Sequence, residues 1–231
     1  MNTIKNHRGF TLVEVLFAVA TGIIVMGAAY VAMISGQRSS VGIEEKVAAQ
    51  QDLRGGLEIM SVEIAMASFN PNFVTGIWRD LGCNNPSVNQ AYKGIQAAGA
   101  NTITVEMDIQ ESSAIGDDAN EVITYIYDPL PDQRIRRSTN CGPAQPFLGN
   151  SPGNPRSVRV INDTLNIPVF RYFNGLGAEI PAANLPLSIP DIRRIETTLA
   201  IETEDVDPNT QQRRRMFYSN SVIPRNHAIT P

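Results

Sequence analysis

Histidine and cysteine, two residue types that often build catalytic and metal sites, are scarce in this sequence. Its 231 residues include two histidines, His7 and His227, and two cysteines, Cys83 and Cys141. A structural zinc site takes about four ligands, more than two cysteines supply. A nucleophile activated by a base would depend on His227, because His7 lies in the basic N-terminal leader. We therefore expect neither an enzyme nor a bound metal or cofactor.

Signatures of nucleotide and nucleic-acid binding are also missing. No segment fits the phosphate-binding pattern G-x-x-x-x-G-K-[ST], and a net charge of −4 gives no support for a nucleic-acid partner. The run of three arginines at 213–215 is short and favours a solvated hairpin edge over a binding patch. The segment GNSPG at 149–153 lacks the apolar strand that leads into a nucleophile elbow, so we expect a loop there.

Acidic residues gather at 117–118 and again between Glu202 and Asp207. Their spacing does not match the calcium loop of an EF-hand. We expect solvated turns at both places, with calcium bound at Glu204–Asp207 as the alternative.

One long apolar segment dominates the N-terminal region. Residues 10–34 are 25 in number (34 − 10 + 1), and they are apolar or small apart from Thr11, Glu14, Thr21 and Tyr30. A helix of that length reaches roughly 37 Å, enough to cross a hydrocarbon core of about 30 Å. Lys5 and Arg8 precede it, so the positive-inside rule keeps the N-terminus in the cytoplasm and sends the rest across the membrane.

Gly9, Phe10 and Glu14 give this segment a more specific character, because they follow the basic leader at fixed offsets. The arrangement resembles the leader of type IV prepilins and of type II secretion pseudopilins. The resemblance implies that a prepilin peptidase cleaves between Gly9 and Phe10 and methylates the new amine of Phe10. It also implies that Glu14 pairs with the N-terminal amine of a neighbouring subunit during assembly. An acid inside a membrane helix is costly, and such residues usually have a partner.

Two other interpretations of the segment remain. A secretory signal peptide would have an apolar region of about 7–15 residues before a small-residue cleavage site, which Ala29 and Ala32 imitate. A plain membrane anchor would need no acid at position 14. Gly22, Gly27, Ala28 and Ala29 would allow close approach of neighbouring helices, or they are merely tolerated small residues.

Helical signals continue beyond the membrane segment as far as residue 69, and no proline occurs before Pro71. Gly55–Gly56 is a weak point, since each glycine in a helix costs about 1 kcal/mol relative to alanine. The residues Asn70–Asn72 should end the helix. The apolar stripe expected to face a sheet comprises Leu53, Leu57, Met60, Ile64 and Ala67.

Period-two patterns replace helical ones after residue 72 and predict an antiparallel sheet. We expect a polar turn at 204–214 between the last two strands and a loop at 143–155. The layout is an α+β fold, with a leader at 1–9, a helix at 10–69 and an exported β domain at 70–231. The predicted strands are 102–109, 122–128, 169–173, 195–201 and 216–222.

The segments LRGGLEIMSVEIAMASF at 53–69, ITYIYD at 123–128, IRR at 135–137 and VIPRN at 222–226 resemble PilW-type minor pilins and GspJ-type minor pseudopilins. The resemblance implies a pilin-like fold and a subunit that assembles with other minor pilins and the major pilin on an inner-membrane platform. It would start pilus assembly and support twitching motility. A secretion pseudopilus subunit and a tip adhesin are the alternatives.

The two cysteines are the right number for one disulfide. The predicted orientation places Cys83 and Cys141 in the periplasm, or at the cell surface after assembly, where disulfides persist. We therefore expect a Cys83–Cys141 bridge, with two unpaired thiols as the alternative.

Overall fold

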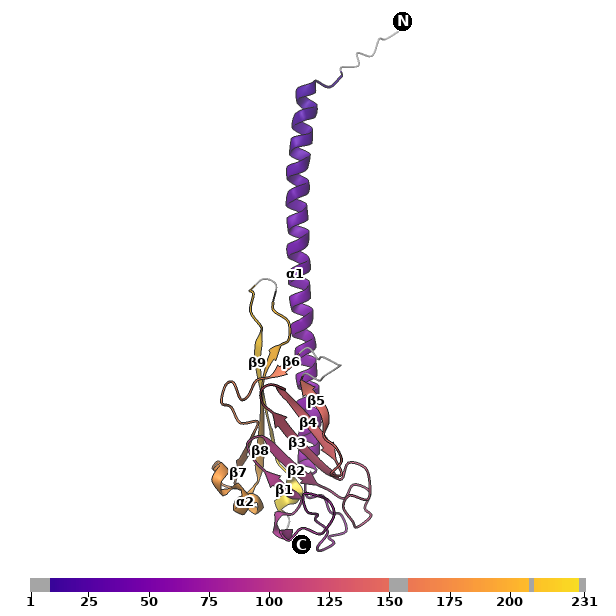
Figure 1. Cartoon of the computed structure of the whole chain (residues 1–231), viewed down its shortest axis with the longest axis vertical. Coiled ribbons are helices and arrows are strands. Elements are labelled where there is room, and N and C mark those ends of the chain that lie inside the picture. Colours follow the sequence, from indigo (N-terminus) through magenta and orange to yellow (C-terminus); the bar gives the residue numbers. More distant parts are fainter. Residues whose placement is uncertain (1–8, 150–157, 208–209, 229–231) are drawn as a thin grey trace.

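The computed structural model describes residues 9–149, 158–207 and 210–228. The predicted leader, its basic residues and His7 lie outside this part of the chain, apart from Gly9. One helix, α1 (Leu12–Ala65), projects from a compact β domain, and its N-terminal half stands clear of the rest of the protein (Figure 1). The α+β fold class predicted from the sequence is confirmed, with antiparallel pairing throughout both sheets.

The helix α1 runs without interruption through Gly55–Gly56, the predicted weak point. A Cβ atom added at Gly56 would lie 3.6 Å from side-chain atoms of Leu148 and Phe147, whereas one at Gly55 would meet nothing within 4 Å. Packing against the β domain on one side therefore supports the helix at this glycine pair.

The helix ends at Ala65, earlier than the predicted end at 69. Ser68 has a positive φ of 67°, which an α-helix cannot accommodate. Its backbone N–H donates instead to the Glu106 carbonyl oxygen, at 2.8 Å. A contact with a distant strand, and not the sequence Asn70–Asn72, sets the helix terminus.

The first sheet contains five antiparallel strands in the order of the chain. Strand β3 coincides with the predicted segment, but the strand predicted at 102–109 ends at Glu106. The backbone N–H groups of Met107 and Asp108 leave the sheet to donate to Glu121 and Phe69. The strands are β1 (Ile95–Ala98), β2 (Thr102–Glu106), β3 (Val122–Asp128), β4 (Arg134–Thr139) and β5 (Gln145–Gly149).

Strand β5 corrects the expectation of a loop across 143–155, the later part of which lies outside the described residues. Pro146 made this segment look like a loop, because proline cannot donate to a strand ladder. Strand β5 is the edge of its sheet, where a proline is tolerated.

The second sheet is centred on β8 (Arg194–Thr203), which pairs with β6 (Val158–Val160), β7 (Phe170–Phe173) and β9 (Arg215–Val222). The predicted hairpin of the last two strands is confirmed. Its far end reaches back along α1 (Figure 1), where Asp207 and Arg214 lie 3.6 Å from the Cβ position of Gly42. Short 3₁₀ and α-helical turns, including α2 (Leu185–Ser188) and Arg225–Ala228, close the β domain.

The core lies between the C-terminal half of α1 and the two sheets. Figure 1 shows this half of the helix beside the strands. The stripe predicted from the sequence is buried, with relative exposures of 5% or less for Leu53, Leu57, Met60, Ile64 and Ala67. Both faces of β2 are buried, including Thr104 and Glu106. The C-terminal half of the helix is therefore a central element of the β domain.

Candidate functional site

The N-terminal half of α1 exposes its apolar side chains in every direction. Residues 12–33 are all exposed, and a helix of this length and composition is able to cross a membrane. Phe10, which precedes the helix, is 87% exposed. Such a surface is stable only against lipid or against the apolar helices of other subunits.

Glu14 lies in the first turn of this helix and takes part in a capping box with Thr11. Its Oε2 accepts hydrogen bonds from the Thr11 backbone N–H and hydroxyl group, each at 2.9 Å, while its own N–H donates to Thr11 Oγ1 at 3.3 Å. Within the described part of the chain, all hydrogen bonds to the Glu14 carboxylate go to Oε2. The single acid of the span therefore sits beside Phe10 and orders the start of the helix.

The glycines proposed to admit neighbouring helices are open in the single chain. A Cβ atom at Gly22 or Gly27 would meet nothing within 4 Å. This openness is compatible with close helix packing and with simple tolerance of small residues, so the role of these positions stays a prediction.

Cys83 and Cys141 form a disulfide with a Cα–Cα distance of 5.8 Å. It ties the loop after α1 to the turn that follows β4. Both sulfur-bearing residues pack against a small second core of Ile77, Trp78, Ile115 and Val122. The bridge thus fastens the loop after α1 to the five-stranded sheet.

Two carboxylates in the predicted alternative calcium site form ion pairs with arginines. Glu204 pairs with Arg159, and Asp207 pairs with Arg214. The arginines at 213–215 also form ion pairs within the protein, because Arg213 and Arg215 both pair with Glu202. Arg213 and Arg215 thus lie on a solvated hairpin edge, as predicted. The solvated turn predicted at Glu204–Asp207 is wrong at Asp207, which is buried beside Arg214.

The other acidic group has its carboxylate oxygens within 4.8 Å of one another in Asp117, Asp118 and Glu121. Glu121 Oε2 accepts the backbone N–H groups of Gly116, at 2.8 Å, and Asp118, at 3.2 Å. Burial raises the pKa of Glu121, and the neighbouring Asp117 raises it further. Its side chain therefore organises the loop that precedes β3, and we assign no metal to it.

His227 has a partner that the sequence did not suggest. Its Nδ1 lies 3.0 Å from Ser68 Oγ, although 159 positions separate the two residues. Its Nε2 lies 2.8 Å from the Ile189 carbonyl oxygen, which indicates that Nε2 carries the proton. Burial lowers the pKa of His227, so the ring is neutral near pH 7.

Ser68 Oγ and His227 Nδ1 lie at the spacing of a nucleophile and its base, but the Ser68 hydroxyl also donates to the Lys93 carbonyl oxygen, and the two nearest backbone N–H groups are already paired. An acyl-transfer site needs backbone N–H groups aimed at the developing oxyanion. The Ser68 N–H donates to Glu106 and the Phe69 N–H donates to Met66, at 2.8 and 3.0 Å. The pair therefore acts as a clasp that joins the C-terminal turn to the end of α1.

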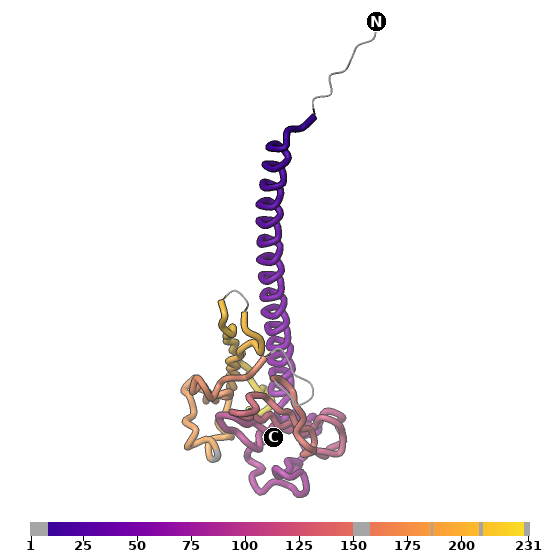
Figure 2. The backbone as a smooth tube through the Cα atoms, turned by 45° about the horizontal axis from the view of Figure 1, so that its top comes forward, coloured from indigo at the N-terminus to yellow at the C-terminus, as the bar shows by residue number. Residues whose placement is uncertain are grey.

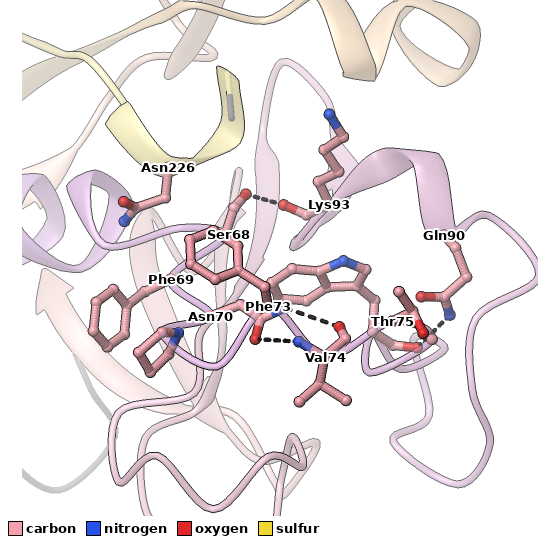
Figure 3. A pocket seen from close by; sticks show the side chains of 12 residues that line it. Ser68, Phe69, Asn70, Phe73, Val74, Thr75, Gln90, Lys93 and Asn226 are labelled. Carbon is pink, nitrogen blue, oxygen red and sulfur yellow. Dashed lines mark hydrogen bonds between the residues drawn. The ribbon is translucent and has the colours of Figure 1, made fainter. Parts of the chain in front are cut away.

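A pocket of about 300 Å³ opens beside this clasp. It is formed by the loop after α1 together with Gln90, Lys93 and Asn226, and Figure 3 shows the rings of Phe69 and Phe73 and, across from Phe69, Gln90. No motif in the sequence indicated this pocket, because it depends on how the irregular loop after α1 folds back on itself and against Asn226.

Comparison with known proteins identifies one segment. Residues 4–30 match the model of the prokaryotic N-terminal methylation motif. No curated protein and no solved structure matches the chain. The motif supports a type IV pilin-like or pseudopilin protein, which implies processing by prepilin peptidase and assembly into a pilus or pseudopilus. Together with the exposed apolar helix, it indicates membrane anchoring.

Proposed function

We propose that this protein is a minor type IV pilin of the PilW type, which assembles with other minor pilins and the major pilin to start a pilus. The observation that carries the proposal is the continuous helix Leu12–Ala65, fully exposed in its apolar half and matched there by the methylation motif. The role is structural and non-enzymatic. Its partners are the peptidase, the inner-membrane platform and membrane lipid before assembly.

The mechanism follows from the position of Glu14. Cleavage after Gly9 leaves a charged amine on Phe10, directly before the capping box. A subunit that enters the filament buries this region among apolar helices, where unpaired charges are costly. Pairing the Glu14 carboxylate with the amine of a neighbouring Phe10 satisfies both charges in one register. The acid thus selects the axial position of the incoming subunit while the apolar side chains supply the contact area.

Processing is tested first on the protein from native membranes, isolated without reductant. We expect intact-mass and N-terminal sequencing to give a chain that starts at methylated Phe10. A start at Met1 would indicate a plain anchor, and a start beyond Ala32 would indicate a secreted protein. Either result would overturn the proposal.

The assembly role is tested with Glu14→Ala and Glu14→Gln. Both variants should enter the membrane and lose Gly9 normally, but neither should be recovered in sheared filaments, because a neutral side chain cannot pair with the amine. Thr11→Ala is the matched control, since it removes a capping contact and leaves the charge. Recovery of Glu14→Ala in filaments at the level of the unmodified chain would refute the charge pairing.

Deletion of the protein distinguishes the pilus from the alternatives. A PilW-like subunit should be required for surface pili and twitching motility, with enzyme secretion retained. Loss of secretion with pili retained would favour a GspJ-like pseudopilin. Loss of adhesion in cells that still make pili would favour a tip adhesin.

A further inference from the structure

The pocket beside the Ser68–His227 clasp lies at the pole of the β domain opposite the N-terminus of α1. The loop of residues 69–93, which forms most of its lining, occupies that end of the molecule in both views (Figures 1 and 2). The membrane-spanning segment is at the other end. The pocket therefore remains accessible when the protein is anchored by its helix.

Backbone strain holds an exposed aromatic ring at this pocket. Phe73 has a φ of 52°, a conformation that is rare for bulky residues, and its side chain is 58% exposed. The Asn70 side chain fixes the turn, because its Nδ2 donates to the Val74 carbonyl at 2.9 Å and its Oδ1 accepts the Val74 N–H at 3.1 Å. Strained and over-determined residues of this kind cluster at ligand-binding sites.

Most polar groups in the lining are already engaged within the protein. Asn70 uses both ends of its amide on Val74, and the Gln90 amide nitrogen donates to the carbonyl groups of Trp78 and Ser87 at 2.9 and 2.7 Å. Ser68 faces His227. A saccharide would lose the hydration of many hydroxyl groups here without gaining enough partners. The rings of Phe69, Phe73 and Trp78 favour a flat apolar ligand instead.

We propose that this pocket binds an aromatic ring that carries one hydrogen-bond donor, of the phenol or indole class. Its volume of about 300 Å³ suits one or two rings. Thr75, Lys93 and Asn226 supply other polar side chains of the lining. Gln90 Oε1 is buried and has no hydrogen-bond partner in the described part of the chain, so it is placed to accept one directional hydrogen bond from a ligand. This activity goes beyond assembly and does not depend on it.

The single tryptophan, Trp78, lines the pocket and gives a specific probe. The full chain is labelled with 5-fluorotryptophan, placed in lipid nanodiscs and titrated with p-cresol while its one fluorine resonance is followed. We expect a saturable shift with a dissociation constant on the order of 0.1–1 mM, typical of a small ligand. N-acetyltyrosinamide separates two sources of the ring: binding at least as tight as that of p-cresol indicates a ring carried by a peptide, and weaker binding indicates a free molecule.

Phe73→Gly should weaken p-cresol binding about fivefold or more, because it removes the ring while glycine accepts the positive φ. Glu111→Gly is the matched control, since Glu111 also has a positive φ, of 60°, and does not line the pocket. It should bind p-cresol as the unmodified chain does. The proposal is overturned if p-cresol gives no saturable shift, if methyl glucoside saturates the pocket in its place, or if the two glycine variants bind equally.

Discussion

Arg137 Nη2 lies 2.6 Å from Glu63 Oε1 and thereby joins strand β4 to helix α1 across 74 positions of the chain. Tyr125, which faces Arg137 directly in the β3–β4 pairing, donates its hydroxyl to the same carboxylate. The two side chains of the ion pair are 21% and 18% exposed. Strands β3 and β4 thus both bind Glu63 of α1, and these contacts fix the position of the sheet along the helix.

Arg137→Ala should lower the free energy of unfolding by about 2 kcal/mol, because it leaves a largely buried carboxylate with fewer donors. Urea unfolding of the full chain in detergent, followed by circular dichroism, measures the change. Arg171→Ala is the control. Arg171 pairs with Glu179 and, at 3.4 Å, with Glu196, but its own side chain is 38% exposed, so each exposed pair should contribute less than about 1 kcal/mol. Equal losses in the two variants would contradict the role assigned to Arg137.

The disulfide should make a larger contribution, because it closes a long loop. Cys83 and Cys141 are 58 positions apart, and the chain-entropy relation gives about 4 kcal/mol for a loop of that size. A Cys83→Ser, Cys141→Ser double variant should therefore unfold at a distinctly lower urea concentration when monitored by Trp78 fluorescence. Adding reductant to the double variant should change nothing further. A double variant as stable as the oxidised chain would contradict the estimate.

Glu106 should make stability fall as the pH rises. Burial raises its pKa from the ordinary 4.5 to about 8, so the folded protein keeps a proton that the unfolded chain releases. The associated stability is fully present below pH 4.5 and is lost as the pH rises toward 8. Glu106→Gln stays neutral and should be more stable than the unmodified chain at pH 7.5, on the order of 2–4 kcal/mol.

The comparison between these two chains is made by urea unfolding at pH 5 and pH 7.5. Their difference should be small at pH 5 and large at pH 7.5, because other titrating groups, such as His227, act equally in both. A difference that is the same at the two pH values would show that Glu106 is ionised in the folded protein.

Periodicity predicted the elements whose packing is decided locally. The stripe from Leu53 to Ala67 carries a strong helical repeat, and the strand Val122–Asp128 is rich in β-branched and aromatic residues. The structure buries the first and pairs the second as expected. Strand β6 has three residues, too few to show a repeat, and β5 contains a proline. Their pairing depends on neighbours that are distant in sequence, which is why the sequence did not reveal them.

The candidate sites divide in the same way. The site around Gly9, Phe10 and Glu14 could be predicted from the sequence, because it depends on fixed spacings along one segment. The methylation motif covers that segment. The clasp of Ser68 with His227 and the nearby pocket depend on tertiary contacts between segments with no common pattern. Nothing in the spacing of those residues identifies them.

The last prediction concerns Gly94, where the backbone packs closely against the backbone of Ser68 and Glu106. Its φ is 78°, and a Cβ atom there would lie 2.7 Å from the Glu106 carbonyl oxygen and 2.8 Å from Ser68 Cα. Gly76 has a similar φ of 75°, but a Cβ atom at that position would meet nothing within 4 Å. The two glycines therefore separate the cost of the left-handed conformation from the cost of the steric clash.

Gly76→Ala should lower the free energy of unfolding by about 1–2 kcal/mol, the cost of a left-handed alanine. Gly94→Ala carries that cost and must also displace backbone atoms of Ser68 or Glu106, so we expect its loss to exceed that of Gly76→Ala by about 2 kcal/mol or more. Urea unfolding compares them. Because Ser68 follows the end of α1 and contacts His227, Gly94→Ala should also loosen the C-terminal turn, seen as faster amide exchange at His227. Equal stability of the two variants would mean that the backbone at Ser68 moves aside freely, and the clasp would then not be rigid.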